Sequence, residues 1–194
     1  MTAKHIILAS SSRYRRELLK RLGLPFKAWS PELDEHAFAG ESPRQTAMRL
    51  ARAKAHAGLG PWPQAWIIGC DQVADLDGEA IGKPGSLAKA RQQLRKLSGK
   101  SVLFHTALCL AHAEPTRSHE RLVTTEVRYR VLSAREIDRY LAREPAFDCA
   151  GSAKSEGLGI ALLECCLGED PSALVGLPLM ALAQLLRAEG FELP

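Results

Sequence analysis

Short apolar runs alternate with amphipathic stretches along this chain, and the pattern predicts an α/β protein. Residues 6–8 and 65–69 are apolar runs of strand length, which predicts two buried strands. Residues 101–112 and 121–132 alternate apolar and polar positions, which predicts two long antiparallel strands around the Glu114-Pro115 turn. Because helices do not follow strands in a regular repeat, we expect a mixed sheet rather than a doubly wound dinucleotide fold.

Helix-start signals divide much of the remaining chain. Ser42 and Ser133 are each followed three residues later by Gln or Glu, the capping-box pattern, which predicts helices reaching Gly58 and about Ala142. Asp77-Gly78 lies between two short apolar runs and predicts a hairpin turn. Further helices are expected over residues 13–22, 86–99 and 178–190.

The composition is typical of a single-domain globular protein but does not identify its function. The chain has 194 residues, of which 46% are hydrophobic and 25% charged, as expected for a single domain spanning residues 1–194. The net charge of +4 suits phosphorylated small molecules and nucleic acids equally. No secretory signal or membrane span is expected. Five cysteines without a CxxC pair predict reduced thiols in the cytoplasm, with neither a zinc site nor a disulfide framework.

The junction between the first strand and the first helix is the clearest candidate for chemistry. It reads Ser10-Ser11-Ser12-Arg13-Tyr14-Arg15-Arg16. Arginines in a first helical turn lie at the positive end of the helix dipole, where cations are unfavourable. Backbone N–H groups, serine hydroxyls and guanidinium groups together would hold an anion such as phosphate. The alternative interpretation is a solvated basic helix face.

Three further polar residues can reach the same end of the sheet. Asp71 directly follows the predicted strand 65–69, and Lys83 follows the strand that returns after the hairpin. Glu35 lies in the extended stretch and loop between Pro25 and Gly40 and would add a second carboxylate. One or two carboxylates beside several cations suit metal-assisted attack on a polyphosphate. Each residue also has a simpler explanation, as an acidic turn residue, a solvated turn cation or a loop charge.

Two enzyme classes fit the sequence poorly. Gly99-Lys100-Ser101 matches the last three residues of the phosphate-binding P-loop motif. Leu94, however, stands where that motif requires glycine, and the segment ends a helix and begins a strand, the reverse of a P-loop. No GxSxG motif or Ser-His-Asp grouping is evident, so the pattern does not favour nucleophilic acyl transfer.

Several of these segments resemble the Maf family of nucleoside triphosphate pyrophosphatases. The resemblance begins with Leu8-Ala9-Ser10-Ser11-Ser12-Arg13-Tyr14-Arg15-Arg16-Glu17-Leu18-Leu19 and covers nearly the whole chain. It implies an elongated mixed sheet with packed helices, like that of the inosine triphosphate pyrophosphatases, in a homodimer. The other matching segments are Pro31-Glu32-Leu33-Asp34-Glu35, Ala53-Lys54-Ala55, Gly69-Cys70-Asp71-Gln72-Val73, Gly82-Lys83-Pro84, residues 150–160, Asp170-Pro171 and Val175-Gly176-Leu177-Pro178.

The family resemblance implies hydrolysis between the α- and β-phosphates of a nucleotide, with Mg²⁺ or Mn²⁺. Asp71 would be the catalytic carboxylate, as general base or metal ligand, and Glu35 would hold metal. The partner would be a small nucleotide rather than a nucleic acid or a membrane. The phosphates would be bound by Ser10, Arg15, Arg16, Lys54 and Lys83.

The resemblance to one substrate branch of the family depends on fewer residues than the resemblance to the family itself. Tyr14, Gln72 and Glu156 resemble the branch that prefers 7-methyl-GTP, whose base is cationic and suits an aromatic face and a carboxylate. Tyr14 could equally pack as a helix-start residue. Arg13 departs from the proline usual in the family. The alternatives are a pyrophosphatase for dTTP, UTP or another modified nucleotide, and a non-catalytic regulator of cell division that binds nucleotide or nucleic acid.

Overall fold

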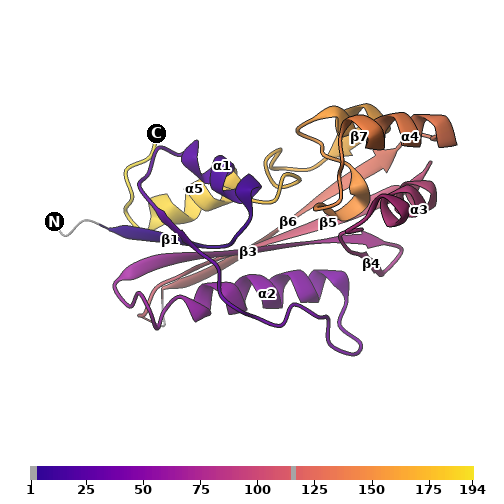
Figure 1. Cartoon of the computed structure of the whole chain (residues 1–194). Helices are drawn as coiled ribbons and strands as arrows, with labels where there is room; N and C mark the ends of the chain where they lie inside the picture. The colour runs from indigo at the N-terminus through magenta and orange to yellow at the C-terminus, as the bar shows by residue number, and fades with distance from the viewer. Residues whose placement is uncertain (1–3, 115–116) are drawn as a thin grey trace.

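Residues 4–114 and 117–194 are described by a computed structural model, in which a mixed sheet organises the chain (Figure 1). Its strands are β1 (His5–Ala9), β2 (Lys27–Trp29), β3 (Ala65–Leu76), β4 (Glu79–Ile81), β5 (Ser101–Ala111), β6 (Ser118–Tyr129) and β7 (Leu163–Leu167). The order is β2-β1-β3-β5-β6-β7, and β4 pairs with β3 outside this path. β1 is parallel to β2 and β3, and the other pairs are antiparallel. The predicted mixed α/β fold is confirmed, although Pro115 of the predicted turn lies outside the described residues.

Four of the five helices in the described residues begin at a serine whose side chain caps the first turn. The helices are α1 (Arg13–Lys20), α2 (Pro43–Ala57), α3 (Leu87–Leu97), α4 (Ala134–Arg143) and α5 (Leu179–Ala188). Ser42 and Ser133 both form the predicted capping boxes, with Gln45 and Glu136 respectively, which satisfy backbone N–H groups at the starts of α2 and α4. No helix within the two described ranges is long and apolar enough to cross a membrane.

Side-chain alternation along the central strands places the helices on two faces of the sheet. Even-numbered residues such as Ile68 and Leu108 pack with α1 and α5. Further along the same face, Phe104 packs in a second core with α3 and α4. Odd-numbered residues such as Ile67 and Ala107 pack with α2 on the opposite face. Figure 1 shows this division, with α2 alone beneath the sheet and the two helix pairs above its two ends.

Strand β3 is longer than predicted, and this changes the position of Asp71. The predicted strand ends at Gly69, with Asp71 just beyond it, but β3 continues through Asp71 because β5 pairs with it along this stretch. In the described residues, β1 pairs with β3 up to Ile68 and β4 pairs with it from Ala74. Residues 69–73 of β3 therefore lie beside a gap between β1 and β4.

The segment before the last helix also differs from expectation. Its apolar residues 160–163 form a short run without the apolar–polar alternation that predicts a strand. The structure has a short 3₁₀-helix at Leu158–Leu162, followed directly by β7, which pairs with β6 and contains Cys165 and Cys166. Cys165 and Cys166 do not continue an alternating apolar–polar pattern, so the sequence does not predict a strand here. The pairing with β6 determines the local structure.

Candidate active site

A cavity of about 750 Å³ opens at the gap beside β3. Its walls come from the loop and first turn of α1, the loop after β2, the middle of α2 and the turn after β4. Most of the residues predicted for the site meet here, although they come from distant parts of the sequence. Those that line the cavity are Ser10, Tyr14, Arg15, Glu35, Lys54, Asp71, Gln72 and Lys83.

A buried lysine joins the two predicted carboxylates. Lys54 Nζ lies 2.6 Å from Asp71 Oδ1 and 2.7 Å from Glu35 Oε1. The side chains of Lys54 and Asp71 are only 8% and 10% exposed, whereas that of Glu35 is 57% exposed. A buried carboxylate needs such a compensating charge, because transfer of an isolated ion out of water is very costly. Lys54 therefore holds Asp71 in place at the cavity surface and reaches Glu35 at its mouth.

Close packing of α2 on β3 brings Lys54 to Asp71. A side chain at Gly69 would place its Cβ 2.1 Å from the carbonyl oxygen of Ala51 and 2.5 Å from the backbone nitrogen of Ala55. Only glycine allows the helix to approach the strand this closely. The side chains of Lys54 and Asp71, each one or two residues from the contact, consequently meet between helix and strand.

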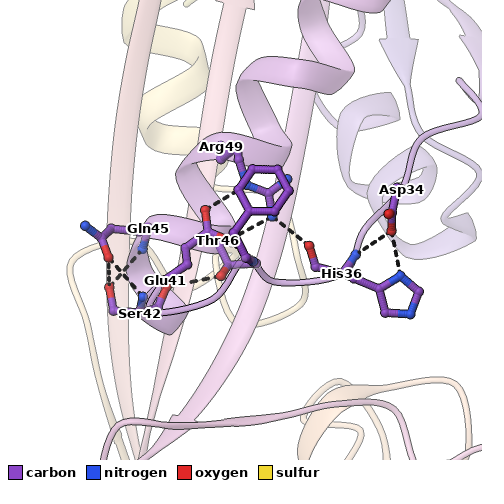
Figure 2. A network of polar contacts seen from close by, with 8 residues as sticks. Asp34, His36, Glu41, Ser42, Gln45, Thr46 and Arg49 are labelled. Atoms are coloured by element: carbon purple, nitrogen blue, oxygen red, sulfur yellow. Dashed lines mark hydrogen bonds and ion pairs between the residues drawn. The ribbon is translucent and has the colours of Figure 1, made fainter.

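A polar network holds the loop that carries Glu35, as Figure 2 shows. Arg49 of α2 donates two hydrogen bonds to Glu41, of 2.7 and 2.8 Å, and one of 2.9 Å to the carbonyl oxygen of His36. Arg49 also lies over the ring of Phe38, with its Cζ atom 4.0 Å from the centroid. Because Arg49 binds the carbonyl oxygen of His36, which directly follows Glu35, α2 positions both Lys54 and the loop opposite it.

The chemistry of the donor set fits a divalent cation. In the described residues no group of three or more His, Cys, Asp or Glu side chains could hold a metal ion. Mg²⁺, however, is commonly bound by one or two carboxylates together with substrate phosphates, and Glu35 and Asp71 supply two. Partial burial opposes ionisation of Glu35, but the hydrogen bond from Lys54 and the charges of Lys83 and Arg15 keep its pKa below the ordinary value. Glu35 is therefore a carboxylate near neutral pH.

The loop before α1 has the groups needed to bind phosphate. The Ser12 hydroxyl caps α1 by accepting a 3.3 Å hydrogen bond from the Arg15 backbone N–H, and the Ser12 N–H donates to Ser10 Oγ at 3.2 Å. The Arg15 side chain donates to Ser10 Oγ at 3.3 Å and to the Gly176 carbonyl oxygen at 2.9 Å. Arg15 is thus fixed toward the cavity. Arg16 points elsewhere: it is exposed and, within the described chain, does not line the cavity.

Gln72 faces the opposite side of the sheet from Asp71, because successive strand residues alternate. Its amide nitrogen donates to Thr106 Oγ1 and to the carbonyl oxygens of Ala173 and Leu174, at 2.9 to 3.1 Å. Gln72 therefore lines the cavity while also holding the loop before α5. The sequence pattern did not reveal this anchoring contact.

The aromatic end of the cavity contains an acidic residue that the sequence pattern did not single out. The Tyr14 hydroxyl donates a 3.0 Å hydrogen bond to Asp148 Oδ2, and both residues line the cavity. Glu156, the carboxylate expected in this role, is exposed and is not among the described lining residues. Asp148 follows α4 in an irregular segment with no local motif, and only the fold brings it to Tyr14.

Comparison with known proteins shows the family of the chain. A family model described as "Maf-like protein" matches residues 5–189, and the chain therefore belongs to the Maf family. A protein named 7-methyl-GTP pyrophosphatase in Xanthomonas campestris pv. campestris (strain 8004) is 55% identical over 189 residues, covering 97% of this chain and 98% of the relative. One with the same name in Methylobacillus flagellatus is 51% identical over 187 residues, covering 96% and 97%.

Among solved structures, a nucleoside-triphosphatase and dITP/XTP pyrophosphatase from Mycobacterium abscessus is similar over 96% of this chain and 98% of its own. Its sequence identity is 18% and the TM-score is 0.44. At that TM-score the likeness adds nothing to the fold described above.

Proposed function

We propose that this chain hydrolyses 7-methyl-GTP between its α- and β-phosphates and releases 7-methyl-GMP and pyrophosphate. The nearly full-length relatives named 7-methyl-GTP pyrophosphatase support this substrate. The observation that carries the proposal is the buried Asp71–Lys54 pair, joined to Glu35, inside a cavity that also contains phosphate-binding groups. A cytoplasmic nucleotide pool and a homodimer are part of the proposal and follow from the family resemblance.

The positive groups of the cavity would hold the triphosphate. Arg15 and Ser10 lie at the start of α1, whose N-terminal N–H groups favour an anion. Lys83 also lines the cavity, on the turn after β4, and is exposed. Phosphate oxygens between these groups would place the phosphoanhydride beside Asp71.

Asp71 would act on the attacking water. The carboxylate accepts a proton from water as the water oxygen forms a bond to phosphorus, and the bridging oxygen leaves with the electron pair of the broken anhydride bond. Lys54 keeps Asp71 oriented through the 2.6 Å contact. Glu35 and Asp71 would hold Mg²⁺ or Mn²⁺ together with substrate oxygens, and the cation would neutralise phosphate charge.

The identity of the products tests the reaction. We expect ³¹P NMR to show pyrophosphate and 7-methyl-GMP as the products of the wild-type protein in the presence of Mg²⁺. Asp71→Asn should abolish both signals. Asp138→Asn should leave them unchanged, because Asp138 is an exposed carboxylate on α4 that pairs with Arg91 of α3. Orthophosphate with a nucleoside diphosphate would contradict cleavage at the α–β bond, and tight DNA or RNA binding without hydrolysis would favour the regulator.

A further inference from the structure

Four charged or aromatic side chains connect the start of α1 with the segment after α4. Tyr14 donates to Asp148 Oδ2, and Arg13 Nη2 lies 2.8 Å from the Tyr14 hydroxyl and 3.4 Å from the same Asp148 oxygen. Lys154 Nζ is 3.4 Å from Asp148 Oδ1. Arg13, Tyr14 and Asp148 all line the cavity that also contains Lys54 and Asp71. The contacts therefore form one wall of the cavity from two distant parts of the chain.

The arrangement of Arg13 resembles that of a bound cationic ligand. Its guanidinium carbon lies 4.8 Å from the centroid of the Tyr14 ring, within the range of a cation–π contact. The same planar, delocalised cation contacts a carboxylate oxygen of Asp148. An aromatic face with a carboxylate beside it is an environment that selects a flat positive group over a neutral one.

We propose that Asp148 is the counter-ion for the cationic base of the substrate, and that Arg13 occupies the position of that cation in the free protein. The inference rests on the proposed function, because N7-methylation is what makes the guanine base cationic. Tyr14 supplies the stacking face, Asp148 the opposite charge, and Arg13 an internal competitor that must move away when the base enters. Asp148 is thus a specificity-determining residue, and Arg13 lowers the affinity for the methylated base.

The position of Asp148 favours it over Glu156 in this role. The Asp148 side chain is half-exposed and lies on the cavity wall, whereas Glu156 is exposed outside the described lining. Burial opposes ionisation of Asp148, but the Tyr14 hydroxyl and Lys154 outweigh it and keep the pKa of Asp148 below its ordinary value. Arg13 is largely exposed and makes contacts of the kind that cost little to break, so a base can displace it.

The test compares substrate preference, measured as the ratio of kcat/KM for 7-methyl-GTP to that for GTP. Asp148→Asn keeps an oxygen that can accept the Tyr14 hydrogen bond but removes the charge, and should lower the ratio about five- to tenfold. Arg13→Ala should raise the ratio about two- to fivefold. The matched controls are Asp138→Asn, an equally exposed carboxylate on α4, and Arg21→Ala, an exposed cation just beyond the far end of α1. Neither should change the ratio.

Calorimetric binding of 7-methyl-GMP and GMP separates this inference from the proposed reaction, because it needs no turnover. We expect 7-methyl-GMP to bind more tightly, with Asp148→Asn removing the difference. If the wild-type protein showed this pattern but released no pyrophosphate, the base site would stand and the proposed reaction would be wrong. Rapid 7-methyl-GTP hydrolysis with a ratio unchanged in Asp148→Asn and Arg13→Ala, or lowered by Glu156→Gln alone, would overturn the inference. Should Asp148→Asn fail to fold, Arg13→Ala decides the question.

Discussion

Replacing Lys54 with methionine removes the ammonium group that lies between the carboxylates of Asp71 and Glu35. Methionine keeps the length of the side chain and a good helix propensity, so α2 itself should be little affected. The substitution changes the charge balance instead. The Asp71 carboxylate, which is 10% exposed, is left near that of Glu35 without the lysine that contacts both. The variant therefore measures how strongly the buried lysine supports the site.

The structure predicts unequal effects for the two partners of the buried pair. Removing one member of a buried ion pair costs about 3–5 kcal/mol, which we expect for Lys54→Met. Asp71→Asn should cost about 1 kcal/mol or less, since Lys54 retains Glu35 as a partner and the asparagine oxygen can still accept its hydrogen bond. The double variant should recover to within about 2 kcal/mol of wild type, because the uncompensated buried charge is gone.

Urea unfolding at pH 7 without nucleotide or metal measures these differences as free energies of unfolding. Lys96→Met is the matched control, because Lys96 contacts Glu79 at the same 2.6 Å distance but is 40% exposed, and it should cost no more than about 1 kcal/mol. The reasoning is refuted if Lys54→Met is as stable as Lys96→Met. It is also refuted if Asp71→Asn is the more damaging substitution, or if the double variant shows no recovery.

Three other predictions concern the surroundings of the site. Arg49→Ala should release the loop that carries Glu35, lower kcat/KM for 7-methyl-GTP and cost about 1–2 kcal/mol of stability; unchanged kinetics would separate the loop from catalysis. The pKa values of Glu41, hydrogen-bonded by Arg49, and Glu136, hydrogen-bonded at the start of α4, are lowered from 4.5 to about 2. Their stabilisation should be complete above pH 4.5 and lost as the pH falls toward 2, so urea unfolding of Glu41→Gln should depend less on pH than that of wild type. Gly69→Ala should cost about 3 kcal/mol, because its Cβ would meet the Ala51 carbonyl oxygen, and an unchanged melting temperature would contradict this.

Local signals in the sequence predicted the elements that depend on neighbouring residues. The capping boxes at Ser42 and Ser133 and the hairpin at Asp77-Gly78 are determined within a few residues, and all three are present. The end of β3 was predicted wrongly because Asp71 and Gln72 look like turn residues. Pairing with β5, which is distant in sequence, keeps both in the strand.

The candidate site was predictable where its residues lie next to recognisable motifs. Ser10, Asp71 and Lys83 follow strands or precede a helix, and the structure brings all three to one cavity. The contact between Lys54 and Asp71 depends on how closely a helix approaches a strand, which no spacing in the sequence reveals. Asp148 reaches the cavity only through the packing of the segment after α4, so its contact with Tyr14 had no local signal.

Pyrophosphate release by the purified protein with Mg²⁺ or Mn²⁺ tests the central claim most directly. The assay compares 7-methyl-GTP, GTP, UTP, dTTP and ITP, with Asp71→Asn as the inactive control. We predict the fastest release from 7-methyl-GTP and complete dependence on Asp71. Release led by UTP or dTTP would keep the reaction and refute the substrate, whereas no Asp71-dependent release from any of the five nucleotides would contradict the proposed activity itself.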